Sequence, residues 1–198
     1  MCEEPEAVIG RYVYINYEDP EAAFRPYDPR FPEVARRVAA LIEARMPEAR
    51  VEHIGSTAVP GCAGKGVVDM MLLYPSGCLA AARDAVDGLG FQRQRSRPNA
   101  FTEDRPVRVG VIEHDGEHFG VHVHIIAADA PEVSTQRRFR DRLRADPALR
   151  HAYVASKQAV LATGISDPDA YNRGKEHIIQ AVLSDVAADE EQPASSFT

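Results

Sequence analysis

The stretch VEHIGSTAVPGCAGKGVVDMMLLY, residues 51–74, carries the strongest indication of the fold. Arg50 to Ile54 is typical of a short strand, and the turn Gly55-Ser56-Thr57 follows it directly. A loop rich in glycine and proline then leads to Gly66–Tyr74, a nearly continuous apolar run that predicts a buried strand. The stretch therefore predicts two strands of a sheet that are joined through a glycine-containing turn.

Asp69 is the most informative residue of this stretch, because its neighbours Val67, Val68, Met70 and Met71 are all apolar. An ionised carboxylate that leaves water without a partner carries a high cost in free energy. A metal ion, a cluster of hydrogen bonds or a cleft at this point would remove that cost, and a local cap or pair is the structural alternative. We interpret Asp69 as a catalytic and metal-binding residue.

The turn before the Asp69 strand is suited to holding an anion. Backbone N–H groups and the hydroxyls of Ser56 and Thr57 can converge on a phosphate, and Gly55 lets the backbone approach closely. Lys65 is either a further phosphate contact or a solvated loop lysine. Gly64-Lys65-Gly66 is not a P-loop, because no Ser or Thr follows the lysine and a strand comes next. The glycine spacing is not that of a dinucleotide fingerprint either.

A second cluster of polar side chains is His122-Val123-His124, within an apolar strand. The period of two puts both imidazoles on one face, where they can bind a metal, move protons or bind a phosphate. Two satisfied core histidines are the structural alternative. Glu52 and His53 precede the Gly-Ser turn and are expected to join the same site.

The rest of the chain predicts further helices and strands around these elements. Asp28-Pro29 opens a helix, with Asp as the N-cap and Pro at the first helical position. Asp115-Gly116 predicts a hairpin turn. The other expected elements are a helix at 79–89, strands near 90–94, 100–103, 107–114 and 118–127, and helices near 131–145, 147–162 and 168–187, the second of these three closed by Gly164.

This order predicts an α/β (α+β) fold, in which a mixed sheet is flanked by helices and a helical C-terminal part follows. We divide the chain into an N-terminal arm (1–25), an α/β core (26–128), a helical C-terminal part (129–187) and a disordered tail (188–198).

Composition narrows the class of function. The formal net charge of −7 argues against broad nucleic-acid binding. Six arginines between Arg137 and Arg150 still form a basic stripe, which is either a contact for an anionic small molecule or a solvated helix face. Three widely spaced cysteines, an acidic N-terminus and no apolar run of about 18 residues predict a cytoplasmic protein without a membrane partner.

The segment HIGSTAVPG, from His53 to Gly61, followed by Lys65 and Asp69, resembles the signature of the GrpB family. Pro26-Tyr27-Asp28-Pro29 and His122-Val123-His124 fit the same pattern. The resemblance runs from about residue 26 to residue 183. Its C-terminal positions are Phe139-Arg140-Asp141, Tyr153, Lys157, Tyr171 and Lys175.

GrpB proteins are placed in the nucleotidyltransferase (polymerase-β-like) fold superfamily, and some are fused to dephospho-CoA kinase. The resemblance therefore implies a nucleotidyltransferase-like sheet. In working members of that superfamily Gly-Ser holds the triphosphate and an Asp-x-Asp pair holds Mg²⁺. Gly55-Ser56 and Asp69 match this pattern, but Met71 stands at the position of the second acid, and methionine does not bind Mg²⁺.

Three functions are compatible with these residues. The first is a nucleotidyltransferase-like enzyme that binds ATP or another NTP and transfers a nucleotidyl or phosphoryl group to a small-molecule acceptor. The second is a non-catalytic nucleotide or phosphometabolite binder. The third is an enzyme of another reaction class that uses Asp69, His122 and His124 with Mg²⁺, a transition metal or no metal. In the first, Asp69, His122 and His124 are the catalytic and metal-binding residues, and His53, Gly55, Ser56, Thr57, Lys65, Lys157, Tyr171 and Lys175 bind the substrate.

Overall fold

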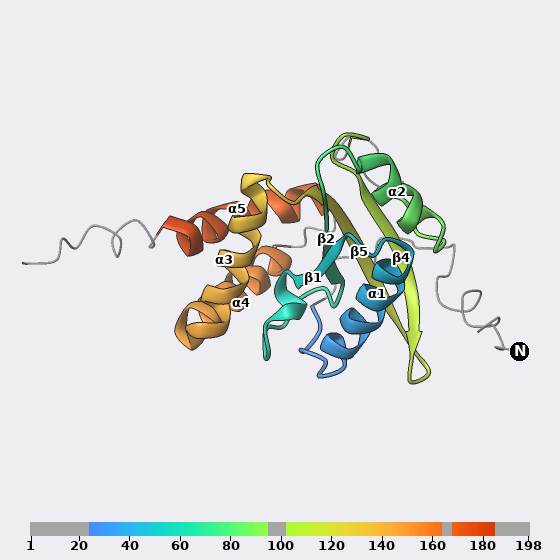
Figure 1. Cartoon of the computed structure of the whole chain (residues 1–198). Helices are drawn as coiled ribbons and strands as arrows, with labels where there is room; N and C mark the ends of the chain where they lie inside the picture. The colour runs from blue at the N-terminus through green and yellow to red at the C-terminus, as the bar shows by residue number, and fades with distance from the viewer. Residues whose placement is uncertain (1–23, 95–101, 164–167, 185–198) are drawn as a thin grey trace, which may run out of the picture.

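The computed structural model describes residues 24–94, 102–163 and 168–184 of the 198-residue chain. In that part of the chain, helices flank a sheet and three of them gather at one end (Figure 1). The elements are α1 Phe31–Arg45, β1 Arg50–Ile54, the 3-10 turn η1 Ser56–Ala58, β2 Val68–Tyr74, α2 Leu79–Asp87, β3 Gln92–Arg93, β4 Val107–His114, β5 Glu117–Ala127, α3 Pro131–Ala145, α4 Pro147–Ala162 and α5 Pro168–Ser184. The predicted mixed α/β fold with a helical C-terminal part is confirmed.

The described strands form one mixed sheet in the order β1-β2-β5-β4-β3. β2 and β5 run parallel near its centre, and the other neighbouring pairs are antiparallel. Asp69 pairs with His122 and Met71 pairs with His124. Because paired residues point to the same face and side chains alternate along a strand, these four side chains share one face of the sheet.

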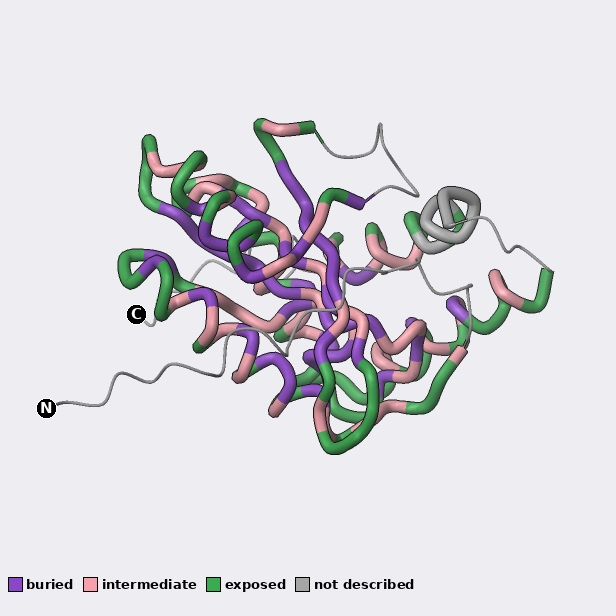
Figure 2. The backbone as a smooth tube through the Cα atoms, turned by 90° about the vertical axis from the view of Figure 1, so that its right-hand side faces the viewer, coloured by how far each residue is buried: buried purple, intermediate pink, exposed green. Residues whose placement is uncertain are grey.

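The opposite face of the sheet carries the main hydrophobic core. Val68, Met70 and Leu72 of β2 point into it together with Val121 and Val123 of β5. Helices α1 and α2 cover this face, and buried backbone runs through the sheet while the turns are exposed (Figure 2). The buried residues of α1 recur at helical spacing, as the sequence predicts: Phe31, Val34, Ala35, Val38 and Ile42.

The three C-terminal helices build a second cluster that includes the loop after β1. Val59 and Cys62 of that loop pack with Phe139, Tyr153 and Val182 of α3, α4 and α5. α4 begins as the sequence predicts, because the side chain of Asp146 accepts hydrogen bonds from the backbone N–H groups of Ala148 and Leu149. The helical part is therefore packed directly on the predicted phosphate loop.

Two local predictions are wrong. Asp28 does not cap α1, because its carboxylate accepts the N–H of Arg30 at 2.8 Å in a turn that precedes the helix. Thr102 and Glu103 are not in a strand, since the Arg105 N–H closes a turn onto the Thr102 carbonyl at 3.1 Å. The carboxylate of Glu103 instead binds Arg83 and Arg108.

Several predictions lie wholly or partly outside the described residues. They are the arm up to residue 23, the start of the strand near 100–103, the closing Gly164, the Asp167-Pro168 cap and the tail. Arg25, the last residue of the predicted arm, is described, and its backbone pairs with Gly64. The division into a core and a helical part stays a prediction. Across the described segments, every helix is too short or too polar to cross a membrane.

Candidate functional site

The turn after β1 brings the backbone of Gly55 against the carboxylate of Asp69. Ile54, the last residue of β1, pairs with Asp69 across the sheet, so the chain turns away beside that side chain. Gly55 has a φ of 68°, and a Cβ at this position would lie 2.6 Å from Asp69 Oδ2. Only glycine combines this backbone conformation with so close an approach. The predicted proximity of the Gly-Ser turn and Asp69 is therefore present.

Asp69 also faces both imidazoles of β5. Its Oδ1 lies 3.6 Å from His122 Nδ1 and 3.7 Å from His124 Nε2. Of the seven residues of β2, all of them described, only Asp69 is not buried, and its side chain is 29% exposed. The strand thus buries its apolar residues while its carboxylate keeps contact with solvent and with two proton-carrying groups.

Met71 occupies the position of the second acid and is fully buried, with 0% exposure. It packs in a small apolar cluster with Ile54, Leu73 and Ile126 of the sheet and Val133 of α3. This cluster covers one end of the face that carries Asp69. A carboxylate at position 71 would need a partner there, so methionine suits the apolar packing.

The donor set does not fit the two-magnesium centre that the fold family implies. It offers one carboxylate, Met71 fills the position of a second, and imidazole is a poor ligand for Mg²⁺. Within residues 24–94, 102–163 and 168–184, no group of three or more His, Cys, Asp or Glu is arranged to hold a metal ion. Metal binding by Asp69, His122 and His124 therefore stays a prediction.

His53 lies on the other face of the sheet, because it pairs with Met70. Its Nε2 lies 3.0 Å from Thr57 Oγ1, which in turn donates a hydrogen bond to the Val67 carbonyl. Burial lowers the pKa of His53 to about 4, although Asp69 opposes this shift. A neutral His53 that carries its proton on Nε2 can donate a hydrogen bond to Thr57 Oγ1, so His53 stabilises the loop from the core face of the sheet. Its role as a substrate contact stays a prediction.

Lys157 of α4 is buried against the same loop, with 2% exposure. Its Nζ donates to the Ala63 carbonyl, lies 3.6 Å from Cys62 Sγ and stands 4.4 Å from the centre of the Tyr153 ring. Burial lowers the pKa of Lys157, and the nearby thiol and Asp69 act in the opposite direction. The described contacts of Lys157 are structural, while its contact with a substrate stays a prediction.

Ser56 Oγ and Lys157 Nζ both lie next to the Cα of Gly64, on the side where a side chain would project. A Cβ at position 64 would lie 2.9 Å from Lys157 Nζ and 3.2 Å from Ser56 Oγ, so glycine leaves room for both polar groups. Lys65 follows in the same loop and is half-buried. Tyr171 lies on α5, and so does Lys175, but their side chains are outside the described residues. The predicted roles of Lys65, Tyr171 and Lys175 stay predictions.

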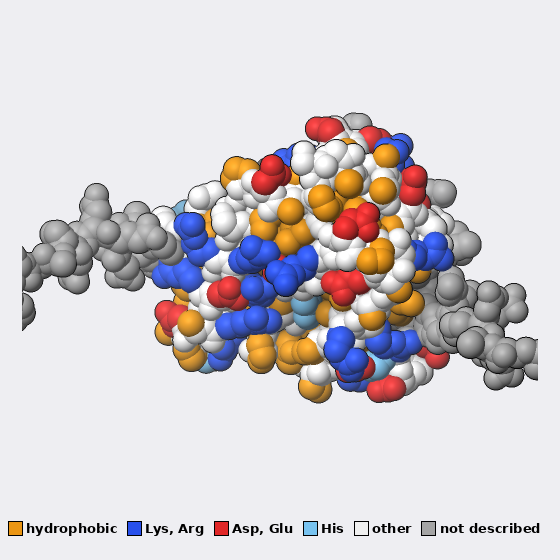
Figure 3. Space-filling model, in the orientation of Figure 1, with side chains coloured by type: hydrophobic (Ala, Val, Ile, Leu, Met, Phe, Trp, Pro, Cys, Tyr) orange, Lys and Arg blue, Asp and Glu red, His pale blue; other side chains and the backbone are white. Residues whose placement is uncertain are grey.

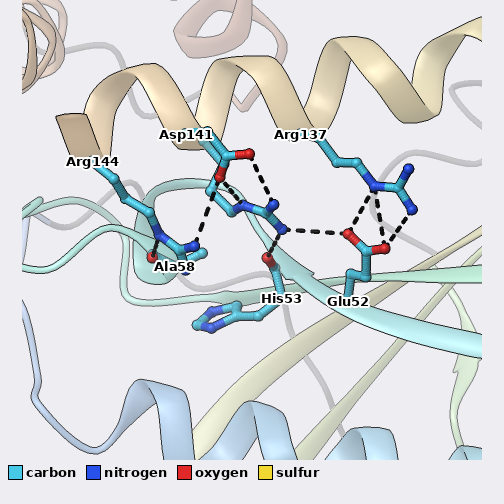
Figure 4. A network of polar contacts seen from close by, with 7 residues as sticks. Glu52, His53, Ala58, Arg137, Asp141 and Arg144 are labelled. Atoms are coloured by element: carbon cyan, nitrogen blue, oxygen red, sulfur yellow. Dashed lines mark hydrogen bonds and ion pairs between the residues drawn. The ribbon is translucent and has the colours of Figure 1, made fainter. Parts of the chain in front are cut away.

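The basic stripe of α3 forms a clamp on β1 that the sequence alone did not assign. Arg137 and Arg140 both bind the carboxylate of Glu52, and Arg140 also donates to the His53 carbonyl at 3.2 Å (Figure 4). Arg144 donates to the Ala58 carbonyl at 2.8 Å. Glu52 points toward α3 whereas the His53 ring points away from it (Figure 4).

This clamp adds structural contacts to two interpretations of the sequence. Lys and Arg side chains gather on one face where α3 meets β1 (Figure 3). Three of them, at positions 137, 140 and 144, bind Glu52 and loop carbonyls. The side chain at position 140 is 14% exposed, whereas those at positions 137 and 144 keep 40% and 44% exposure, so contact of the stripe with an anionic small molecule stays a prediction. Glu52 belongs to this clamp, on the Asp69 face by register. In the sequence, the only sign of this clamp was the helical spacing of three and four residues between Arg137, Arg140 and Arg144.

The mixed sheet and the Gly55–Asp69 arrangement agree with the scaffold that the resemblance to the GrpB family predicts. The sequence pattern described as "GrpB protein" matches residues 21–185, and the chain belongs to the GrpB family. The predicted resemblance is thereby confirmed.

Three comparisons illustrate this family relationship. UPF0157 protein PA4798 of Pseudomonas aeruginosa is 31% identical over 185 residues, which are 90% of this chain and 73% of that protein. A dephospho-CoA kinase of Mycolicibacterium paratuberculosis is 31% identical over 76% of this chain, but this region is 42% of that protein. The crystal structure of the conserved protein GrpB from Enterococcus faecalis has a TM-score of 0.63 at 21% identity and covers 83% of this chain and 99% of that chain. That likeness shows the shared fold.

Proposed function

We propose that this protein is a nucleotidyltransferase-like enzyme that binds an NTP and transfers a nucleotidyl or phosphoryl group to a small-molecule acceptor. The observation that carries the proposal is the Asp69 carboxylate, which lies against the Gly55 turn and 3.6–3.7 Å from two imidazoles. A glycine turn with a nearby hydroxyl suits a phosphate chain, and an acid with two histidines suits proton transfer beside it.

The described geometry supports different roles for the two sides of the site, phosphate binding on the loop side and proton transfer on the strand side. Ser56 Oγ lies close to Gly64 on the loop side, where it can donate to a phosphate oxygen. On the strand side, Asp69 holds an ion-pair distance to His122 and His124 and can fix the orientation of either ring. An oriented imidazole can then take the proton of an attacking hydroxyl.

Met71 favours a second candidate function, a nucleotide or phosphometabolite binder without catalysis. Its buried position leaves the strand with one carboxylate where catalytic relatives of the superfamily are expected to have two. A third function, another reaction that uses Asp69, His122 and His124, predicts a protein that binds no NTP. These functions differ in two measurable properties, NTP binding and NTP turnover.

The test is thermal unfolding with ATP, CTP, GTP and UTP at millimolar concentration, with and without MgCl₂, combined with assays for released pyrophosphate and nucleoside diphosphate. A ligand that binds only the native state raises the apparent melting temperature. We expect a rise with at least one NTP and turnover in the presence of an acceptor. Binding without turnover favours the second function, and no rise with any NTP contradicts the proposal.

Asp69→Asn tests the site assignment. The side chain is partly exposed, so the variant should melt within about 3 °C of the wild type, yet lose turnover by about 100-fold. Asp115→Asn is the matched control, because Asp115 lies in the exposed β4–β5 turn with a φ of 51° that asparagine also adopts. If Asp69→Asn kept full activity, Asp69 would have no catalytic role.

A further inference from the structure

A cavity of about 300 Å³ adjoins the candidate site at the ends of β2 and β5. Tyr74 and Ala127, the last residues of these two parallel strands, line it. The turn before β4 and the beginning of α3 form its other walls. Ligands of open α/β sheets commonly bind beyond the carboxyl ends of the strands. A volume of this size accommodates a small molecule.

His124 connects this cavity to Asp69. His124 lines the cavity, and its Nε2 lies 3.7 Å from Asp69 Oδ1. Ile126, two residues further along β5, shares the face of His124 and also lines the cavity. One side chain is therefore shared by the carboxylate site and the cavity.

The cavity has an apolar floor and a charged rim. Pro106, Val107 and Ile126 are buried and supply the floor, whereas Asp104 and Arg105 at the rim are exposed. This arrangement accommodates the carbon skeleton of a ligand and leaves its polar groups at the mouth.

The charges at the mouth favour a cation over an anion. The described lining contains two carboxylates, Asp104 and Glu132, and one guanidinium, Arg105, which gives a formal charge of −2 + 1 = −1. Arg105 is ion-paired with Glu132 and also acts on the charge of Asp104, so these three side chains together leave one negative charge unbalanced. A hydrogen bond from Thr102 lowers the pKa of Asp104, which keeps this carboxylate ionised at neutral pH. An anionic acceptor would meet like charge at this mouth and again at Asp69.

The geometry points to this cavity as the acceptor site of the proposed transfer, and to a small amino alcohol as its occupant. This inference rests on the proposed function. The hydroxyl of the acceptor faces His124 and its ammonium faces Asp104. The acceptor oxygen forms a bond to a phosphorus of the NTP, and the bridging P–O bond breaks. The leaving pyrophosphate or nucleoside diphosphate takes that electron pair, and His124 takes the hydroxyl proton.

The experiment compares three acceptors of similar size with one NTP: serinol, which is an amino alcohol, glycerol, which is neutral, and glycerate, which is anionic. Product is measured by mass spectrometry, and acceptor binding is measured separately by titration calorimetry. We expect the order serinol, glycerol, glycerate in kcat/KM. Asp104→Asn should lower the preference for serinol over glycerol by about fivefold, through KM rather than kcat.

Asp115→Asn serves again as the control and should keep the preference. A second variant, Ala130→Leu, narrows the cavity at its α3 wall and should raise the acceptor KM while the NTP-dependent rise in melting temperature persists. Equal use or binding of serinol and glycerate, or an unchanged preference in Asp104→Asn, would overturn the inference. Failure of the proposed function looks different, because then either no NTP raises the melting temperature or an NTP binds and none of the three acceptors gives a product.

Discussion

At the scale of the residue, Gly55 and Asp69 depend on each other. A side chain at position 55 would be strained at a φ of 68° and would collide with the carboxylate, which lies 2.6 Å from the place of its Cβ. Asp69 in turn is the residue of β2 that keeps solvent contact. The glycine thus provides the room that lets a carboxylate interrupt an otherwise buried strand.

His53 should make the stability of the protein depend on pH. Its pKa is about 4 in the folded protein and about 6.5 when unfolded, so between these values the unfolded chain binds more protons. Stability is therefore full above pH 6.5 and falls as the pH falls toward 4, by up to about 3 kcal/mol for this residue. Urea unfolding of His53→Gln at pH 4.5, 5.5, 6.5 and 7.5 should show a flatter profile than the wild type.

His118→Gln is the control for that series, because His118 is an exposed histidine of β5. It should retain the slope of the wild type between pH 4.5 and 6.5. If His53→Gln has the wild-type slope as well, then His53 is protonated in the folded protein and does not support the loop as a neutral donor to Thr57.

At the scale of the element, the two Asp-Pro motifs whose residues are described differ in how well they predict the start of a helix. Asp146 caps α4, and the sequence places that helix correctly from Pro147 to Ala162. The same dipeptide at Asp28-Pro29 fails, because Asp28 binds the Arg30 N–H in a separate turn and α1 begins at Phe31. The motif fixes a turn, whereas packing of the helix decides where regular hydrogen bonding starts.

The packing of α4 against α5 predicts that replacing Gly174 by alanine destabilises the protein, whereas helix propensity alone would predict stabilisation. Gly174 of α5 approaches α4 so closely that a Cβ there would lie 2.8 and 2.9 Å from the two methyl carbons of Val160. Gly174→Ala should therefore destabilise the protein by about 1–3 kcal/mol through overpacking, although alanine favours helices by about 1 kcal/mol. Thermal and urea unfolding measure the change.

A double-mutant cycle with Val160→Ala isolates this contact. Removing the valine methyl groups makes room for the alanine, so the double variant should recover at least part of the loss caused by Gly174→Ala. Strict additivity of the two changes would show that the two helices do not meet at this contact.

At the scale of the whole molecule, the sequence predicted three side chains that lie together on one face of the sheet, but it did not predict what surrounds them. Strand period and the apolar run identified Asp69, His122 and His124, and the strand register brings the three together. The clamp of α3 on Glu52 joins residues 85 and 88 positions apart, and no local pattern reports a pairing at that separation. Lys157 is buried under the loop because of the way α4 packs against it, and the pattern of residues along α4 alone does not predict that packing.

The clamp should contribute to the stability of the molecule as a unit, because it ties the helical part to β1. The Glu52 side chain is 18% exposed and receives hydrogen bonds from both Arg137 and Arg140. Glu52→Gln keeps the shape but removes the charge, and at pH 7 we expect a loss of about 1–2 kcal/mol in the free energy of unfolding, more than an isolated surface pair gives. Urea unfolding measures it, with exposed Glu48→Gln as the control.

The pH dependence of the free energy of unfolding of Glu52→Gln distinguishes stabilisation by the carboxylate charge from stabilisation by packing. The hydrogen bond from Arg137 and the nearby charges hold the pKa of Glu52 below its ordinary value of 4.5. An acid with a depressed pKa stabilises the fold fully above the unfolded pKa, and this contribution is lost as the pH falls through the folded pKa. The difference between wild type and Glu52→Gln should thus shrink below pH 4.5, because protonation then makes the wild-type side chain neutral as well. A difference that stays constant down to pH 3 would assign the effect to packing, and the two arginines would then hold α3 on the sheet without help from the carboxylate charge.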